Sequence, residues 1–306
     1  TFTNHQNGDF KPYAIKTTDG GRTWTSINGD LPARGSTHAI IEDFVDPSLL
    51  FIGTEFGAFA TRDGGTHWFK LAGIPTIAVR DFAIQKREHD LVIGTFGRGI
   101  YIVDDYTPLR TTTPATLAAA ATLFPVRDAL LFVPTQQYGG RGKAFQGEML
   151  YSGDNPPYGA AVTYYLKDGL KTLKQKRLDA EKAAEKAGQP IAYPTPEQMR
   201  AEAAEEAPSI LLTISDSSGT PVRTITGPSG KGIQRVAWNL QLPSHTLPRP
   251  SNPLEELFES GPSGPYVVPG RYSVTMAQRV GGVTTTLGAP VSFRVVTEPG
   301  APGRLT

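Results

Sequence analysis

The chain has 306 residues, enough for about two domains of roughly 100–200 residues each. Its 30 Lys and Arg residues against 29 Asp and Glu give a net charge of +1, so no overall field attracts nucleic acid or an anionic membrane. The lack of cysteine excludes disulfides and thiolate metal sites. No apolar run approaches the roughly 20 residues that span a bilayer, and we expect no membrane span.

Glycine and proline are frequent, at 33 and 26 residues, which is typical of short strands joined by tight turns. We therefore expect a mainly β protein. The chain begins at Thr1 in the run TFTNHQ, without an initiator methionine, and we expect the true N-terminus to lie upstream.

Two pairs of segments repeat at the length of one four-stranded propeller blade. The runs IGTEFG and IGTFGRG begin at Ile52 and Ile93, an offset of 41 residues, and TTDGGRTW at 17–24 and TRDGGTHW at 61–68 are offset by 44. Repeats of about 40–50 residues predict propeller blades. A complete blade is predicted with strands at about 38–45, 49–55, 57–62 and 67–71. A partial blade precedes it, and a third follows with strands near 79–85, 91–96 and 99–104.

Both DGG runs have the form Ser/Thr-x-Asp-x-Gly-x-x-Trp, which is called an Asp box. Its carboxylate can accept hydrogen bonds from the backbone N–H groups of the following turn, its glycine supplies a positive φ, and its tryptophan packs between strands. We predict a structural and not a catalytic role for these residues. They are Thr17, Asp19, Gly21, Trp24, Thr61, Asp63, Gly65 and Trp68.

The boxes, together with the runs FKPY at 10–13, GTEFG at 53–57, GTFGRG at 94–99 and VDD at 103–105, resemble the closing blades of bacterial sortilin-like proteins with BNR (Asp-box) repeats, which are often labelled glycosyl hydrolases. The resemblance covers residues 1–108. It implies an incomplete β-propeller, whose remaining blades come from a missing N-terminal part of the chain or from another subunit. It also implies an extracellular or periplasmic location.

The second half predicts a different β domain. We expect a connecting segment at 109–135, an Ig-like β-sandwich at 136–298 with a helical insertion at about 168–207, and a tail at 299–306. Sandwich strands are predicted at 161–166, 209–214, 221–225, 232–240, 270–278 and 283–296. The runs IQRVAWN at 233–239 and PGRY at 269–272 resemble the sandwich that follows the propeller in this family, with Trp238 in its core. The glycine-rich run at 139–142 lacks the helix and Lys-Ser/Thr pair of a phosphate loop.

The sequence contains no HExxH, no GxSxG and no metal-spaced cluster, so we expect no catalytic, cofactor or metal site in this chain. In an up-and-down blade, the loop entering the first strand and the loop between the second and third strands share one end, opposite the Asp box. Mixed charged and aromatic residues at that end predict a ligand face. The alternative is that Arg80, Asp81 and Arg98 pair with one another at buried blade ends. The predicted face comprises His38, Glu55, Phe56, Arg80, Asp81, Phe96 and Arg98.

These observations predict a non-catalytic binding or scaffold portion of an exported protein, with a protein or glycan ligand and no nucleic-acid partner. One alternative is a secreted glycoside hydrolase of the BNR-repeat type, because such an enzyme needs two carboxylates across a cleft and most of its catalytic residues would lie upstream. Another alternative is an assembly subunit of a larger complex.

Overall fold

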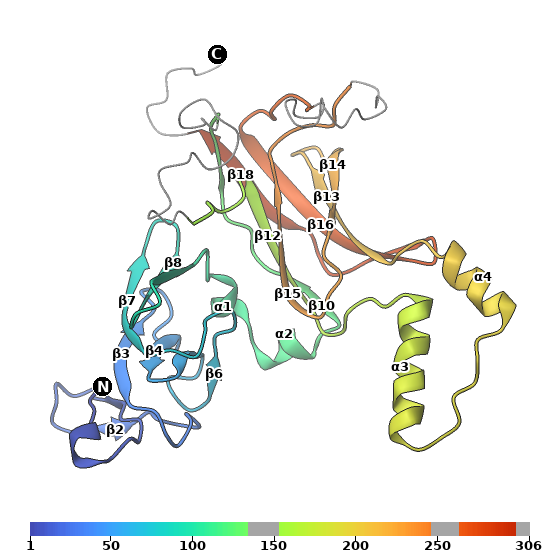
Figure 1. Cartoon of the computed structure of the whole chain (residues 1–306). Helices are drawn as coiled ribbons and strands as arrows, with labels where there is room; N and C mark the ends of the chain where they lie inside the picture. The colour runs from blue at the N-terminus through green and yellow to red at the C-terminus, as the bar shows by residue number, and fades with distance from the viewer. Residues whose placement is uncertain (134–152, 246–262, 298–306) are drawn as a thin grey trace, which may run out of the picture. The chain divides into compact units, whose positions relative to one another are not determined.

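The structure is a computed structural model that describes residues 1–133, 153–245 and 263–297 (Figure 1). It divides into two compact units, residues Thr1–Thr112 (unit 1) and Thr113–Thr306 (unit 2), and both consist mainly of β-strands. The glycine-rich run at 139–142 and the predicted tail at 299–306 lie outside the described residues. In the described ranges, no helix combines the length and the apolar character that crossing a membrane requires.

Unit 1 consists of three antiparallel sheets that follow one another along the chain, with the short helices η1 (His5–Asn7) and α1 (Pro108–Thr111) near its ends. The first sheet has two strands, β1 (Ile15–Lys16) and β2 (Thr25–Ser26). The second has the order β3-β4-β5-β6, with β3 (Thr37–Glu42), β4 (Leu50–Thr54), β5 (Gly57–Thr61) and β6 (Trp68–Lys70). The third has the order β7-β8-β9, with β7 (Val79–Gln85), β8 (Asp90–Thr95) and β9 (Ile100–Val103).

The middle sheet of unit 1 is buried on both faces. Successive side chains of a strand point to opposite faces, so Phe51 and Ile52 of β4 enter two different apolar clusters. Phe51 packs in a cluster with Ala58, Val79 and residues of β8, whereas Ile52 packs in a cluster that includes Ala14, the residue before β1. The flanking sheets thus remove both faces of β4 and β5 from water, and every residue of these two strands is buried.

A buried charged cluster joins the end of unit 1 to its middle sheet. Arg110 of α1 donates two hydrogen bonds to Asp43, at 2.9 and 2.7 Å, and the Tyr106 hydroxyl donates a third at 2.5 Å. The Asp43 side chain is fully buried, and although burial by itself raises its pKa, the bonds from Arg110 and Tyr106 bring the net pKa below its ordinary value. The ionised pair therefore fixes the chain after β9 against the β3–β4 connection.

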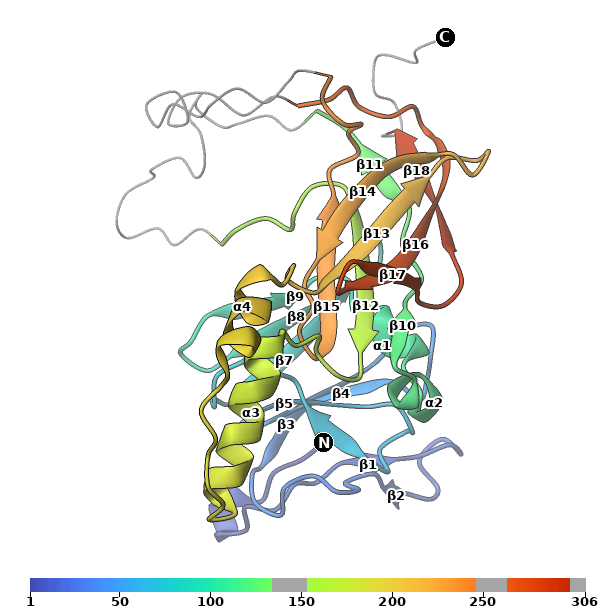
Figure 2. The same cartoon turned by 90° about the vertical axis from the view of Figure 1, so that its right-hand side faces the viewer.

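Unit 2 has two sheets around one core. The smaller sheet has the order β10-β12-β15, and the larger β11-β18-β16-β13-β14, with β17 paired to β16. Trp238 is fully buried and meets the Tyr272 and Phe293 rings at angles of 61° and 81°. Figure 2 shows the long strands of the larger sheet. The strands are β10 (Ala121–Leu123), β11 (Ala129–Leu131), β12 (Ala160–Leu166), β13 (Ser209–Ser215), β14 (Pro221–Gly227), β15 (Gly232–Trp238), β16 (Gly270–Val280), β17 (Val283–Thr286) and β18 (Val291–Thr297).

In the part of the chain after β9, two sequence-based expectations differ from the structure. The segment expected to be a plain connection at 109–135 holds α1, α2 (Pro114–Ala118), β10 and β11, and β10 and β11 add strands to the two sheets. The pairing of β11 with β18 is parallel and joins residues about 166 positions apart, as Ala129 and Val295 show, which no local pattern indicates. The strand expected at 283–296 is divided into β17 and β18.

Helices α3 (Leu173–Lys186) and α4 (Pro196–Ala204) lie between β12 and β13, as the composition predicts. Each begins with a capping box, in which Thr172 or Thr195 accepts a hydrogen bond from the backbone N–H three residues later. Neither helix has a buried residue, and Figure 1 shows the pair standing away from the strands of unit 2. The helices are therefore joined to each other more than to the core.

Candidate functional site

The predicted ligand face contains a hydrogen-bonded group at its centre. His38 lies on β3, Glu55 in the turn between β4 and β5, and Arg80 on β7. Arg80 Nη1 lies 3.1 Å from His38 Nδ1, and His38 Nε2 lies 2.7 Å from Glu55 Oε2. Because a guanidinium can only donate, Nδ1 accepts and the imidazole proton is on Nε2, which donates to Glu55. The three side chains thus form a chain of two hydrogen bonds that connects two neighbouring sheets.

This group borders a hollow of about 490 Å³ in unit 1. The exposed Phe56 ring lies at its edge, and Gly35 allows the ring to approach, since a Cβ at Gly35 would lie 3.1 Å from it. Several residues that line the hollow are not among those predicted from the sequence. They are His5, Phe10, Arg34, Gly35 and Ser36. Three of them, Arg34, Gly35 and Ser36, lie in the loop that enters β3, at the end predicted as the ligand face, so their position could have indicated them.

Three other residues of the predicted face, Phe96, Asp81 and Arg98, do not line the hollow. Arg80 places its guanidinium 5.3 Å from the centre of the Phe96 ring, and Arg34 lies 5.6 Å from that of Phe10, both as cation–π contacts. Asp81 accepts a hydrogen bond from the backbone N–H that follows it, and neither Asp81 nor Arg98 lines the hollow. In the described part of unit 1, Arg80, Asp81 and Arg98 form no ion pair with one another, so the mutual-pairing alternative does not describe this end.

The two Asp-box turns have matching hydrogen bonds. One Asp19 carboxylate oxygen accepts the backbone N–H groups of Arg22 and Thr23, both at 2.9 Å, and Asp63 accepts those of Thr66 and His67 at 2.9 and 2.8 Å. Each threonine that opens a box donates its hydroxyl to the aspartate at 2.8 Å. The glycines at 20, 21, 64 and 65 all have positive φ. Each carboxylate is thus used to hold a turn.

These hydrogen bonds stabilise the ionised aspartates. The Thr23 hydroxyl and backbone N–H, together with Thr17, lower the pKa of Asp19 to about 2. Burial by itself would raise the pKa of Asp63, but bonds from the backbone and ring of His67 and from Thr61 outweigh it and bring the pKa well below its usual range. The Asp63 carboxylate in turn raises the pKa of His67. Carboxyls held ionised in this way are poor proton donors at neutral pH.

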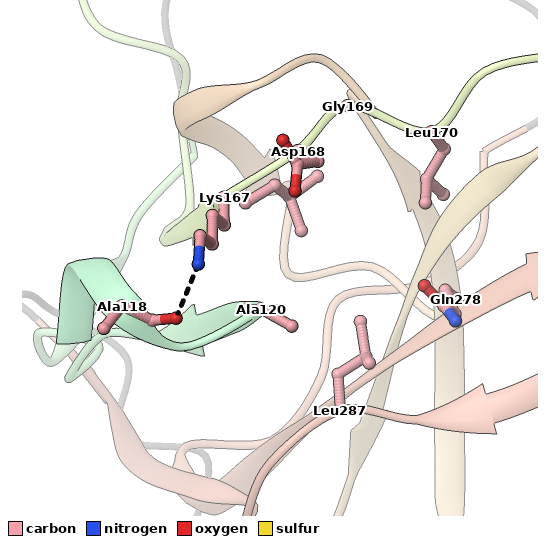
Figure 3. A pocket seen from close by; sticks show the side chains of 10 residues that line it. Ala118, Ala120, Lys167, Asp168, Gly169, Leu170, Gln278 and Leu287 are labelled. Atoms are coloured by element: carbon pink, nitrogen blue, oxygen red, sulfur yellow. Dashed lines mark hydrogen bonds between the residues drawn. The ribbon is translucent and has the colours of Figure 1, made fainter. Parts of the chain in front are cut away.

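Unit 2 has a separate hollow of about 390 Å³, shown in Figure 3. It lies between the end of α2, β10, the segment after β12 and strand β16. Lys167 Nζ lies 3.4 Å from the Ala118 carbonyl oxygen, which places its charge on the backbone of the wall. Much of the remaining lining is alanine, leucine, glycine and backbone, with Asp168 and Gln278 as further polar side chains. It offers fewer converging polar groups than the hollow of unit 1.

The described residues contain no group of three or more His, Cys, Asp or Glu side chains placed to hold a metal ion. No known family profile matches the chain, and no curated protein matches it. Two solved structures match with a TM-score of 0.24: the extracellular domains of a putative one-component system and of a putative hybrid two-component system from B. thetaiotaomicron. Identities are 8% and 9%, and each match covers 93% of this chain and 28% of the other chain.

Proposed function

We propose that this chain is the non-catalytic binding portion of an exported, sortilin-like Asp-box β-propeller protein, in which the sheets of unit 1 are blades and unit 2 is an Ig-like sandwich. The observation that carries the binding role is the hollow beside His38, Glu55 and Arg80. Ligand sites combine apolar surfaces with a few fixed polar groups, and here the rings of Phe10 and Phe56 supply the apolar part. A protein or glycan ligand fits this chemistry.

The hydrogen bonds of the group favour binding over hydrolysis. A propeller glycosidase needs two carboxylates that flank the scissile bond, and among the described residues Glu55 is the one carboxylate that lines this hollow. A Glu55 oxygen accepts from His38, which itself accepts from Arg80, so the three side chains orient one another. We propose that they orient a ligand placed against the two phenylalanine rings.

The test is binding of the intact chain to a glycan array and a peptide array, followed by titration of each hit. We expect at least a tenfold loss of affinity in Arg80→Gln and in Phe56→Ser, because each removes one side of the hollow. Arg87→Gln serves as the matched control, since Arg87 is exposed in the β7–β8 turn at the other end of the same sheet. Equal binding by Arg80→Gln and the parent chain, or hydrolysis of a bound glycan, would contradict the proposal.

A further inference from the structure

The two Asp-box turns are alike inside but differ in what lies against them. Trp68 is 8% exposed, and its Nε1 donates both to Gly65 within the box and to the Ile27 carbonyl oxygen, at 3.2 and 2.9 Å. Trp24 is 56% exposed, and its Nε1 donates to Gly21 at 3.1 Å. In the described residues Trp24 has no counterpart of the bond to Ile27. The first box therefore presents the surface that the second box buries.

The turn at residues 27–30 covers the second box, and each of its four residues has a part in the contact. Asn28 fixes this turn to the segment before β1. Its side chain accepts a hydrogen bond from the Ala14 N–H at 2.7 Å and donates one to the Pro12 carbonyl oxygen at 2.9 Å. Gly29 has a φ of +48°, and a Cβ there would collide with the carbonyl oxygens of Gly65 and Thr66.

Asp30 completes the contact by accepting the backbone N–H of Trp68 at 2.6 Å. On the other side, a Cβ at Gly65 would lie 2.6 Å from the Ile27 Cβ, so the glycine of the box is as necessary for the close approach as Gly29. The covering turn is thus defined chemically as an apolar residue with a free carbonyl, then Asn, Gly and Asp.

We propose that the surface of Gly21 and Trp24 is a docking site for a turn of this type, apolar-Asn-Gly-Asp, carried by a polypeptide segment other than residues 12–31 of this chain. Gly21 leaves the same space as Gly65, since a Cβ there would meet only Trp24, at 3.6 Å. The chain's own turn at 27–30 already lies against Trp68 of the same unit, which disfavours a second copy as the partner. This inference rests on the proposed role of unit 1 as propeller blades and specifies the neighbour that they require.

The direct test inserts a second copy of residues 17–60 between Ala60 and Thr61, because Thr17 and Thr61 open the two boxes at equivalent positions of the repeat. In the resulting chain, the original turn at 27–30 and the strands at 37–60 precede the copied Trp24. The original turn can therefore cover the copied Trp24 as it covers Trp68 in the parent chain. The measurement is broadening of the indole N–H signals in NMR spectra by a soluble nitroxide. The parent chain has three tryptophans and one exposed indole. We expect four signals with still one broadened, whereas two broadened signals would overturn the proposal.

A second test uses substitutions in the parent chain, without an added repeat, and measures the broadening of the Trp68 indole signal. The double substitution Asn28→Ala, Asp30→Ala removes the brace and the acceptor of the turn, so the Trp68 indole should become broadened several-fold more, as Trp24 is. Arg22→Gln, in the first box, is the control and should leave Trp68 unchanged. A Trp68 signal that stays sharp in the double variant overturns the assignment of the turn.

Self-association is read in the same spectra. A Trp24 signal that becomes protected in the parent chain as its concentration rises would mean that a second copy covers it, which also overturns the proposal. These outcomes are independent of ligand binding at Arg80. If that site binds while the copied Trp24 is exposed, the docking inference fails and the proposed function stands.

Discussion

At the scale of single residues, the aspartates of the two boxes stabilise turns. Asp63 accepts the N–H groups of Thr66 and His67, as a helix N-cap residue accepts those of a first turn. Asp63→Ala should lower the free energy of unfolding of the chain by about 0.5–2 kcal/mol, by analogy with loss of such a cap. Urea denaturation measures this, and Asp63→Asn should lose less because it keeps an acceptor.

Binding at the proposed ligand site provides the contrasting measurement for the same variant. Glu55 and Arg80 lie at the end of the strands opposite the Asp-box turn, so Asp63→Ala should leave ligand affinity unchanged. Loss of binding with an unchanged urea midpoint would instead assign Asp63 to the binding site.

Asp19 gives a prediction for pH. Its folded pKa, about 2, lies below the ordinary value of 3.8, so its contribution to stability is fully present above 3.8 and is lost as the pH falls through about 2. Between pH 5 and pH 2, the parent chain should therefore lose more unfolding free energy than Asp19→Asn, which has no carboxyl to protonate at this position. Urea midpoints of both proteins at several pH values measure the difference, and parallel curves would show that the hydrogen bonds of Asp19 do not affect stability.

At the scale of elements, the clearest dependence is that of α1 on the β3–β4 connection. Arg110→Ala leaves the fully buried Asp43 carboxylate without its cation, and breaking a buried pair in this way costs about 3–5 kcal/mol. Arg87→Ala is the control, because Arg87 is 83% exposed and pairs with its sequence neighbour Glu88. Chemical denaturation should show a large loss for the first and almost none for the second, and similar losses would contradict the role of the pair.

The α3–α4 pair predicts the opposite behaviour. Arg177 of α3 contacts Glu202 of α4 at 2.6 Å and Glu181 at 2.7 Å, while neither helix has a buried residue. Arg177→Ala should reduce the helical circular dichroism signal but leave the near-ultraviolet signal of the buried Trp238 unchanged. A parallel loss of both signals would show that the helices stabilise the core of unit 2.

The sequence predicted some elements well and others poorly, for physical reasons. Strand positions in unit 1 follow from the repeat, because Gly53 and Gly94 hold equivalent positions 41 residues apart and each pairs with the start of the next strand. The Asp43–Arg110 pair joins residues 67 positions apart and has no motif. Of the candidate site, His38, Glu55, Phe56 and Arg80 were predicted, while Phe10 was missed because a single aromatic loop residue carries no periodicity. Arg34 was missed although its loop enters β3 at the predicted end.

At the scale of the whole molecule, the outer faces of unit 1 differ from its inner ones. Ala58 of β5 pairs with Gly53, and Ile100 of β9 pairs with Gly94, so the two hold equivalent positions. Ala58 is fully buried against the third sheet, whereas Ile100 is 71% exposed and Ile102, two residues on, is 58% exposed. Together with Trp24, these side chains leave apolar surface open on both flanking sheets, as expected of blades without neighbours.

The central claim, that unit 1 is part of a larger propeller, is tested most directly by expressing residues 1–112 and 113–306 separately and measuring sedimentation and thermal unfolding of each. Unit 2 has its own core around Trp238 and should be a monomer with a cooperative transition. Residues 1–112 expose Ile100 and Ile102 on the third sheet, and the fragment should associate through these side chains and unfold over a broad range of temperature. A monomeric 1–112 fragment with a sharp, cooperative transition would contradict the claim.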